Sequence, residues 1–171
     1  MKVVETDRLR LRELTPEDLE PLSQILSDPI TMSFWPAPLD LEATRQWIDR
    51  NLRSYAECGL GRWAVILKET DELIGDCGIL KAEVAGRREY DLGYIIHHPY
   101  WRRGYAVEAA KACQRYAVET LGLKRLVANM PTDHVASIRV AEKIGMRWEK
   151  TFDNPKNRGL ATHLYALIVG R

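Results

Sequence analysis

The sequence predicts one domain of the mixed α/β class. Segments with strand periodicity and segments with helical periodicity follow each other in the order strand, two helices, three strands, helix, strand, helix and two strands. The three consecutive strands in the middle exclude the regular alternation of a doubly wound sheet. A chain of 171 residues has the length of one domain, so we expect residues 1–171 to form a single unit.

The first third of the chain is predicted to hold one strand and two helices. Residues 6–14 alternate leucine with arginine, which is the period of a strand with one buried face. Thr15 and Pro16, followed by two acidic residues, start a helix whose leucine and isoleucine residues recur at helical spacing. This helix ends near Asp28, and residues 30–40 form a loop with two aromatic residues and two prolines.

The later elements follow from the same two periods and from glycine at helix ends. Gly59, Gly122 and Gly145 each follow a helical segment, where glycine suits a left-handed C-cap. The expected elements are a helix at 41–57, strands at 63–67, 73–80 and 89–96, a helix at 104–121, a strand at 126–130, a helix at 133–144, and strands at 147–151 and 161–169.

Composition and charge narrow the class of protein. Lysine and arginine number 25 and aspartate and glutamate 24, a balance that argues against a general nucleic-acid binder. Cys58, Cys77 and Cys113 lack CxxC or zinc-finger spacing and are expected to be free thiols in a reducing cytosol. No signal-like start and no run of about 18 apolar residues is present, so we expect a soluble, cytoplasmic protein without membrane contact.

The segment between the third central strand and the next helix carries the clearest functional signal. Arg102 and Arg103 give it positive charge, and Gly104 and Ala106 allow a ligand to approach the backbone closely. Successive N–H groups at a helix start bind anions, so the segment is interpreted as a pyrophosphate cradle. The turn alone is more typical of an ordinary strand–helix connection than of a ligand site. It matches neither the dinucleotide nor the P-loop glycine pattern.

Three stretches, in this order along the chain, resemble the GNAT acyltransferase superfamily, and within it the RimJ/RimL-like branch of ribosomal-protein N-acetyltransferases. They are residues 5–12 (ETDRLRLR), residues 91–109, which run from DLGY through WRRGYA, and residues 136–146 (ASIRVAEKIGM). The resemblance implies a mixed, mostly antiparallel seven-stranded sheet, flanked by about four helices and splayed between strands four and five.

The resemblance also implies an acetyl-CoA site without a metal. Backbone amides of the turn would hold the pyrophosphate, and the strand just before it would pair with the amides of pantetheine. The cofactor positions that it implies are Ile95, Ile96, Trp101, Arg102, Arg103, Gly104, Tyr105, Ala106, Asn129, His134, Ser137 and Lys143. His134 departs from the branch, which usually has asparagine there, although an imidazole still donates one hydrogen bond.

The family reaction is direct attack of an amine on the acetyl thioester, and it implies roles for a few residues. A backbone N–H near Ile96 would polarise the carbonyl. Ser137 is the candidate that protonates the leaving thiolate; alternatively it caps or packs in the first turn of its helix. Asp91, with Glu89 behind it, is the candidate base. These carboxylates alternatively bind the ammonium group or face solvent, while a water chain takes the proton.

Candidate acceptor residues are Phe34 and Trp35 in the loop that lines the acceptor side in the family. An aromatic anchor of the loop on the core explains them equally well. His97 and His98 point to opposite sides of an extended chain and are not expected to bind metal. Cys113 is expected in the core and not as a nucleophile.

The leading functional hypothesis is an acetyl-CoA-dependent N-acetyltransferase, monomeric or homodimeric, that acts on a protein N-terminal amine or a small-molecule amine. A CoA-binding sensor, or a catalytically weak homologue, is the alternative from another class. A nucleotide-binding domain is disfavoured, because no acidic residue follows the turn at the spacing of a ribose partner.

Overall fold

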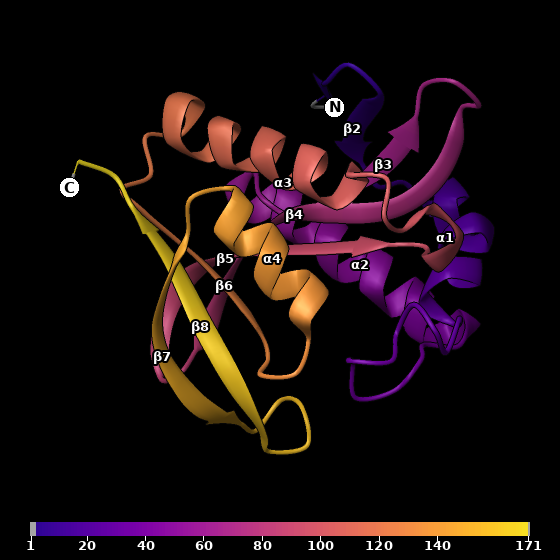
Figure 1. Cartoon of the computed structure of the whole chain (residues 1–171). Helices are drawn as coiled ribbons and strands as arrows, with labels where there is room; N and C mark the ends of the chain where they lie inside the picture. Colours follow the sequence, from indigo (N-terminus) through magenta and orange to yellow (C-terminus); the bar gives the residue numbers. More distant parts are fainter. Residues whose placement is uncertain (1–2, 171) are drawn as a thin grey trace.

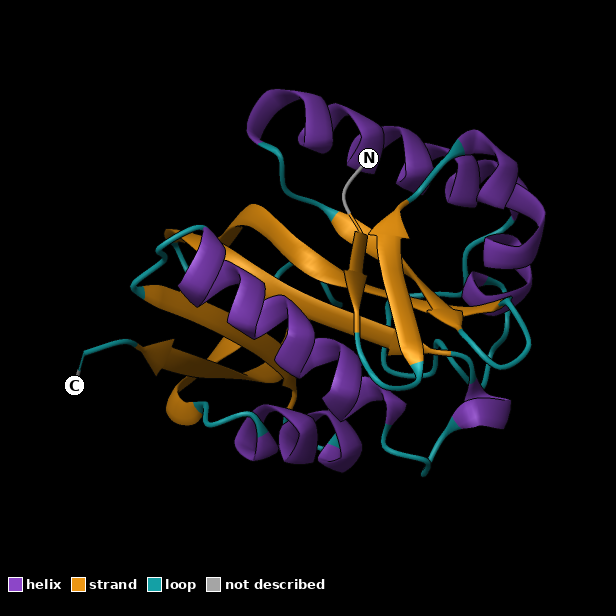
Figure 2. Cartoon of the chain, turned by 90° about the horizontal axis from the view of Figure 1, so that it is seen from above, coloured by secondary structure: helices purple, strands orange, loops and turns teal. Residues whose placement is uncertain are grey.

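The structure, a computed structural model, describes residues 3–170 and is built on a mixed sheet with helices on both faces (Figures 1 and 2). The strands lie in the order β1-β2-β3-β4-β5-β6-β8-β7, and all neighbours are antiparallel except β5 and β6. The elements are β1 (Val3–Glu5), β2 (Leu9–Glu13), α1 (Leu19–Leu26), α2 (Leu41–Cys58), β3 (Arg62–Leu67), β4 (Glu72–Val84), β5 (Arg87–Ile96), α3 (Tyr105–Arg115), β6 (Arg125–Pro131), α4 (Val135–Lys143), β7 (Arg147–Asn154) and β8 (Leu160–Ile168).

Two apolar clusters hold the helices on opposite faces of the sheet. One joins α1 and α2 to residues such as Ala64 and Ile95, and the other joins α3 and α4 to residues such as Leu92 and Ile96. Ile95 and Ile96 are neighbours on β5, so their separation follows from the alternation of side chains along a strand. Residues of one parity on β5 therefore face α1 and α2, and those of the other parity face α3 and α4.

The parallel pair β5–β6 is the point where the sheet opens. Only one residue pair, Asp91 with Val127, is in register between these strands, whereas β4 and β5 pair from residue 75 to residue 96. After Asp91 the edge of β5 is unpaired on the β6 side, and β6 continues against β8. The expected splay between the fourth and fifth predicted strands is thus confirmed.

The structure differs from the prediction at β1, at the β4–β5 hairpin and at α3. The described sheet has eight strands instead of seven, because β1 pairs with β2; three residues are too short to show a period. The strands β4 and β5 are longer than predicted and extend to a tight turn at Ala85 and Gly86, both with positive φ. The polar residues near this turn show too little strand periodicity in the sequence to predict these ends. The helix expected at 104–121 is α-helical only to Arg115 and continues as a π-helical turn.

Gly59 ends α2 with φ +72°, in the left-handed C-cap conformation predicted for it. At the start of the same helix, Asp40 accepts a hydrogen bond from the Ala43 N–H (2.8 Å), an N-cap that was not predicted. None of the helices within residues 3–170 has the length and apolar character needed to span a membrane.

Candidate active site

A cavity of about 540 Å³ lies where β5 and β6 separate. Its wall comes from the loop before α2, the start of β3, the β4–β5 hairpin, the two separating strands, the start of α4 and the β7–β8 segment. The lining residues lie at 34–36, 62, 82–86, 91–94, 129–131, 134, 137, 150 and 152–157. A volume of this size suits a small molecule or the end of a chain.

The cavity takes side chains from both faces of β5. Asp91 and Gly93 lie on the α1 and α2 face, whereas Leu92 and Tyr94 lie on the α3 and α4 face, and all four line the cavity. The opening between the strands therefore connects the two faces of the sheet.

On the α4 side, Tyr94 and Ser137 form a closed pair of hydroxyls. The Tyr94 hydroxyl donates to the Ser137 carbonyl (2.7 Å), and the Ser137 Oγ donates to the Tyr94 oxygen (3.1 Å). Burial raises the pKa of Tyr94, so its hydroxyl stays protonated at neutral pH. Ser137, in the first turn of α4, thus lines the cavity as a proton-carrying group, whereas the helix's N-cap residue makes no side-chain cap hydrogen bond.

On the side of α1 and α2, the cavity wall contains the carboxylate of Asp91. Asp91 is the β5 residue in register with β6, so it lies where the two strands begin to separate. Burial raises its pKa to about 6, while the charge of Arg62 and a hydrogen bond from Asn129 Nδ2 (3.1 Å) act in the opposite direction. Asp91 is therefore ionised at pH 7 and gains a proton a little below it.

Glu89, the second candidate base, is not brought to the cavity. It lies on the same face of β5 as Asp91 but is absent from the cavity wall. Arg125 donates to it from Nε (3.0 Å) and Nη2 (3.1 Å). This fork fixes the carboxylate as a structural partner.

The aromatic loop closes one side of the cavity. The Phe34 ring stacks on the His134 ring with centroids 3.8 Å apart, and Asn157 Nδ2 donates to the Phe34 carbonyl (2.8 Å). Phe34 and Trp35 both line the cavity, and that they contact the acceptor stays a prediction. Burial lowers the pKa of His134 to about 4, so this ring is neutral and stacked at pH 7.

The turn before α3 follows the end of β5 that is unpaired on the β6 side, and its residues Arg102, Arg103 and Gly104 are exposed. Arg102 and Gly104 have positive φ (62° and 81°), and the first hydrogen bond into the helix runs from Glu108 N–H to the Gly104 carbonyl (3.0 Å). From Arg102 to Val107, no backbone N–H finds an acceptor within residues 3–170. Such a row of free amides at a helix start is what an anion site requires.

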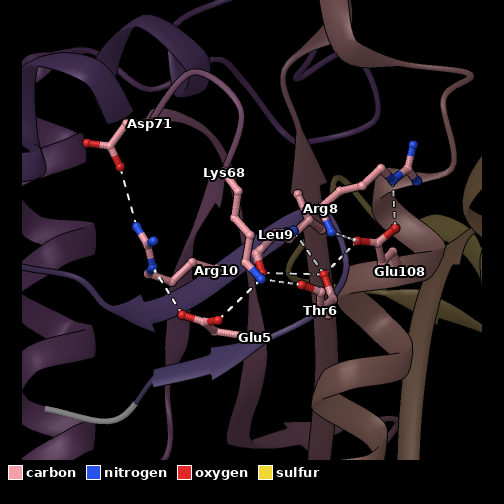
Figure 3. A network of polar contacts seen from close by, with 8 residues as sticks. All are labelled: Glu5, Thr6, Arg8, Leu9, Arg10, Lys68, Asp71 and Glu108. Atoms are coloured by element: carbon pink, nitrogen blue, oxygen red, sulfur yellow. Dashed lines mark hydrogen bonds and ion pairs between the residues drawn. The ribbon is translucent and has the colours of Figure 1, made fainter.

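A polar network holds this turn to the N-terminal strands (Figure 3). Glu108 of α3 accepts from the Thr6 hydroxyl (2.5 Å) and from Arg8 Nε (2.8 Å), and Arg8 Nη1 donates to the Arg103 carbonyl (2.9 Å). The Arg8 guanidinium also lies over the Tyr105 ring, 4.4 Å from its centroid. The network therefore fixes the turn without using its amides.

Strand register decides which backbone groups of β5 face the opening. His97 N–H bonds to the Ile74 carbonyl on β4, so the odd-numbered residues of β5 exchange hydrogen bonds with β4. The N–H and C=O groups of Ile95 consequently face β4, which rules out the expected pairing of a ligand with that residue. Those of Ile96 face the opening, and the Trp101 indole N–H already bonds to the Ile96 carbonyl (2.6 Å).

Three further predicted positions have other surroundings. Lys143 is exposed in the last turn of α4 and does not line the cavity, whereas Asn129 does. His98 Nδ1 lies 2.8 Å from Asp28 Oδ2, and His97 Nε2 lies 3.7 Å from it. The adjacent histidines thus share one carboxylate, so they do not point to opposite sides as expected; that they hold no metal stays a prediction.

Sequence reasoning missed Tyr94, Arg62 and Phe152 as cavity residues. Tyr94 had a usable signal, because it lies three residues after Asp91 and so on the opposite face of the same strand. Arg62 and Phe152 had none, since they reach the cavity from distant strands.

Comparison with known proteins gives the family. Residues 8–147 match the model of the acetyltransferase (GNAT) domain. The Bacillus subtilis protein YkkB is 36% identical over 85% of this chain and 86% of its own, and the uncharacterized N-acetyltransferase YoaA of the same organism is 33% identical over 99% and 98%.

Solved structures agree. A GNAT-family acetyltransferase from Bacillus anthracis superposes with a TM-score of 0.84, at 27% identity over 98% of both chains. RimL, a ribosomal L7/L12 α-N-protein acetyltransferase in complex with coenzyme A, superposes with a TM-score of 0.80 over 98% of both chains; at 15% identity it shows the fold alone. With the opened sheet and its cavity, these matches show that the chain belongs to the GNAT acetyltransferase family and is an N-acetyltransferase.

Proposed function

We propose that this N-acetyltransferase takes its acetyl group from acetyl-CoA and transfers it to a primary amine by direct attack within a ternary complex. The observation that carries the proposal is the opening beside β5, which brings Asp91 and the Tyr94–Ser137 pair into one cavity. Residues 1–171 act as one acetyltransferase domain in this proposal. Its place in the RimJ/RimL-like branch is supported by the sequence motifs and by the fold of RimL.

The turn before α3 fits the pyrophosphate of the donor. Its free amides, from Arg102 to Ala106, offer the donors that phosphate oxygens accept, and Arg102 and Arg103 add charge at an exposed position. On β5, the Ile96 N–H faces the opening and is the backbone N–H nearest the turn that can still donate a hydrogen bond. We assign it to a carbonyl or amide oxygen of acetyl-CoA.

Cavity residues supply the proton chemistry. Asp91, ionised above about pH 6, binds the acceptor ammonium and accepts its proton, which frees the nitrogen lone pair. The Ser137 hydroxyl, backed by Tyr94, supplies a proton to the departing thiolate. Because the two groups lie on opposite faces of β5, proton removal and proton delivery are separated by the opening.

Binding and turnover test this proposal separately. We expect titration calorimetry to show acetyl-CoA binding, and we expect free CoA thiol to appear when a primary amine is added. Binding without thiol release over a broad amine panel would overturn the catalytic part and leave the CoA-binding sensor. Tighter binding of ATP or NAD than of acetyl-CoA would overturn the donor assignment.

A further inference from the structure

Arg62 is a buried cation in the wall of the cavity, and none of the proton-transfer steps uses it. Its exposed fraction is 6%. It starts β3 and is in register with Gly78 of β4, which is in register with Gly93 of β5. A Cβ at Gly93 would overlap the guanidinium, whereas a Cβ at Gly78 would overlap the backbone of Gly61 and Arg62. The missing side chain at Gly93 therefore leaves room for the Arg62 guanidinium beside β5.

Only one edge of this guanidinium is satisfied. Nη1 donates to Asp76 Oδ1 (3.2 Å), while Nε and Nη2 have no acceptor among residues 3–170 and are not sealed by protein. Asp76 has no exposed surface, does not line the cavity and also accepts from the Trp47 indole (2.8 Å). Nε and Nη2 form the edge that binds a carboxylate through two parallel hydrogen bonds.

Neighbouring indoles hold the guanidinium in place. Its Cζ lies 5.4 Å from the Trp47 ring centroid and 5.8 Å from that of Trp35. These contacts are in the range of cation–π attraction, so the free edge is positioned before any ligand arrives.

Asp91 lies on the same face of β5 as Gly93, yet it makes no ion pair with Arg62 within 4.0 Å. The cavity therefore presents a carboxylate and a guanidinium that do not neutralise each other directly. A ligand with an ammonium group for Asp91 and a carboxylate for Arg62 complements both.

We propose that Arg62 and Asp91 together select an acceptor that carries a carboxylate beside its amine, that is, a free amino acid. The inference rests on the proposed function and names its acceptor. Phe34, Trp35 and Phe152 in the same wall favour an apolar or aromatic side chain on that amino acid. A peptide N-terminus offers Arg62 only a neutral carbonyl, which satisfies one donor of the free edge.

Three matched acceptors test the proposal on the unmodified protein. Phenylalanine has the carboxylate, phenylalaninamide replaces it with an amide, and phenethylamine lacks it. We expect kcat/KM for thiol release with phenylalanine to exceed that with phenethylamine roughly 10- to 100-fold, with the amide between them. Equal or higher kcat/KM with phenethylamine would overturn the inference while upholding the acetyltransferase proposal, whereas no release with any amine would overturn the proposed function.

Two variants then assign the preference to Arg62. Arg62→Lys keeps the charge opposite Asp76 but loses the fork, and Gly93→Ala displaces the guanidinium with both charged residues still present. Each should reduce the phenylalanine-to-phenethylamine ratio at least about fivefold. Arg45→Lys, on the exposed surface of α2, is the matched control and should keep the ratio. An unchanged ratio in both folded variants would contradict the role of Arg62.

Discussion

Asp91 combines a cavity position with a pKa near the working pH, and this makes it the most informative residue to titrate. Because its pKa is about 6, the ionised form that accepts a proton disappears as the pH falls through 6. We predict that kcat/KM declines on acidification with a midpoint near pH 6. Asp91→Asn should lower kcat roughly 100-fold and abolish that limb. A variant with the same pH profile as the wild type would contradict the assignment.

Ser137 is predicted to matter more for turnover than for donor binding. Ser137→Ala removes the hydroxyl that faces Tyr94, so kcat should fall roughly 10- to 100-fold while acetyl-CoA affinity, from calorimetry, stays within about threefold. Tyr94→Phe keeps the ring and is the comparison variant. A normal kcat for Ser137→Ala together with a slow Tyr94→Phe would transfer the proton-donor role to Tyr94.

At single residues, the sequence indicated several side chains of the cavity wall. Asp91, Ser137, Phe34 and Trp35 line the cavity, while their roles stay predictions. Glu89 lies on the same face of β5 as Asp91, but Arg125 of β6 binds its carboxylate. No local sequence pattern indicates that partner. Arg62 was not predicted for the same reason, because its guanidinium occupies the space left by Gly93, on a strand that is distant in the sequence.

Among the elements, the turn before α3 depends on one backbone conformation. Gly104 has φ +81°, and a Cβ there would meet only Arg8 Nη2 at 3.4 Å, so a side chain is excluded by the backbone and not by the core. We predict that Gly104→Val weakens acetyl-CoA binding more than about tenfold in calorimetry, because the amides lose their arrangement.

A second glycine provides the control for that variant. Gly122 follows the π-helical turn with φ +68° and has open space around it, far along the chain from the turn. Gly122→Val should cost about 1–2 kcal/mol of stability from the same backbone strain yet leave acetyl-CoA affinity unchanged. Equal affinity losses in both variants would show that the effect is general destabilisation.

The helices and the central strands were predictable because their apolar residues repeat at helical or strand spacing over many residues. α2 was expected at 41–57 and is observed at Leu41–Cys58, with the predicted glycine cap, Gly59, at its C-terminal end. The strand β1 and the ends of the β4–β5 hairpin were not, because three-residue and polar segments carry too little periodicity.

For the whole molecule, the decisive feature is the single register pair between β5 and β6. Apolar periodicity predicts two strands there but contains nothing about where they part, so the splay followed from the family resemblance. The opening gives the cavity access to both faces of the sheet, and the proposed reaction places its two substrates there side by side.

The most direct measurement is the stoichiometry of products from acetyl-CoA and a primary amine, quantified by mass spectrometry. We predict N-acetylated amine and free CoA in equal amounts, with no acetyl group on the protein. Acetylated protein formed before the amine is added would contradict direct attack, and CoA release without N-acetylated product would contradict acetyl transfer to an amine.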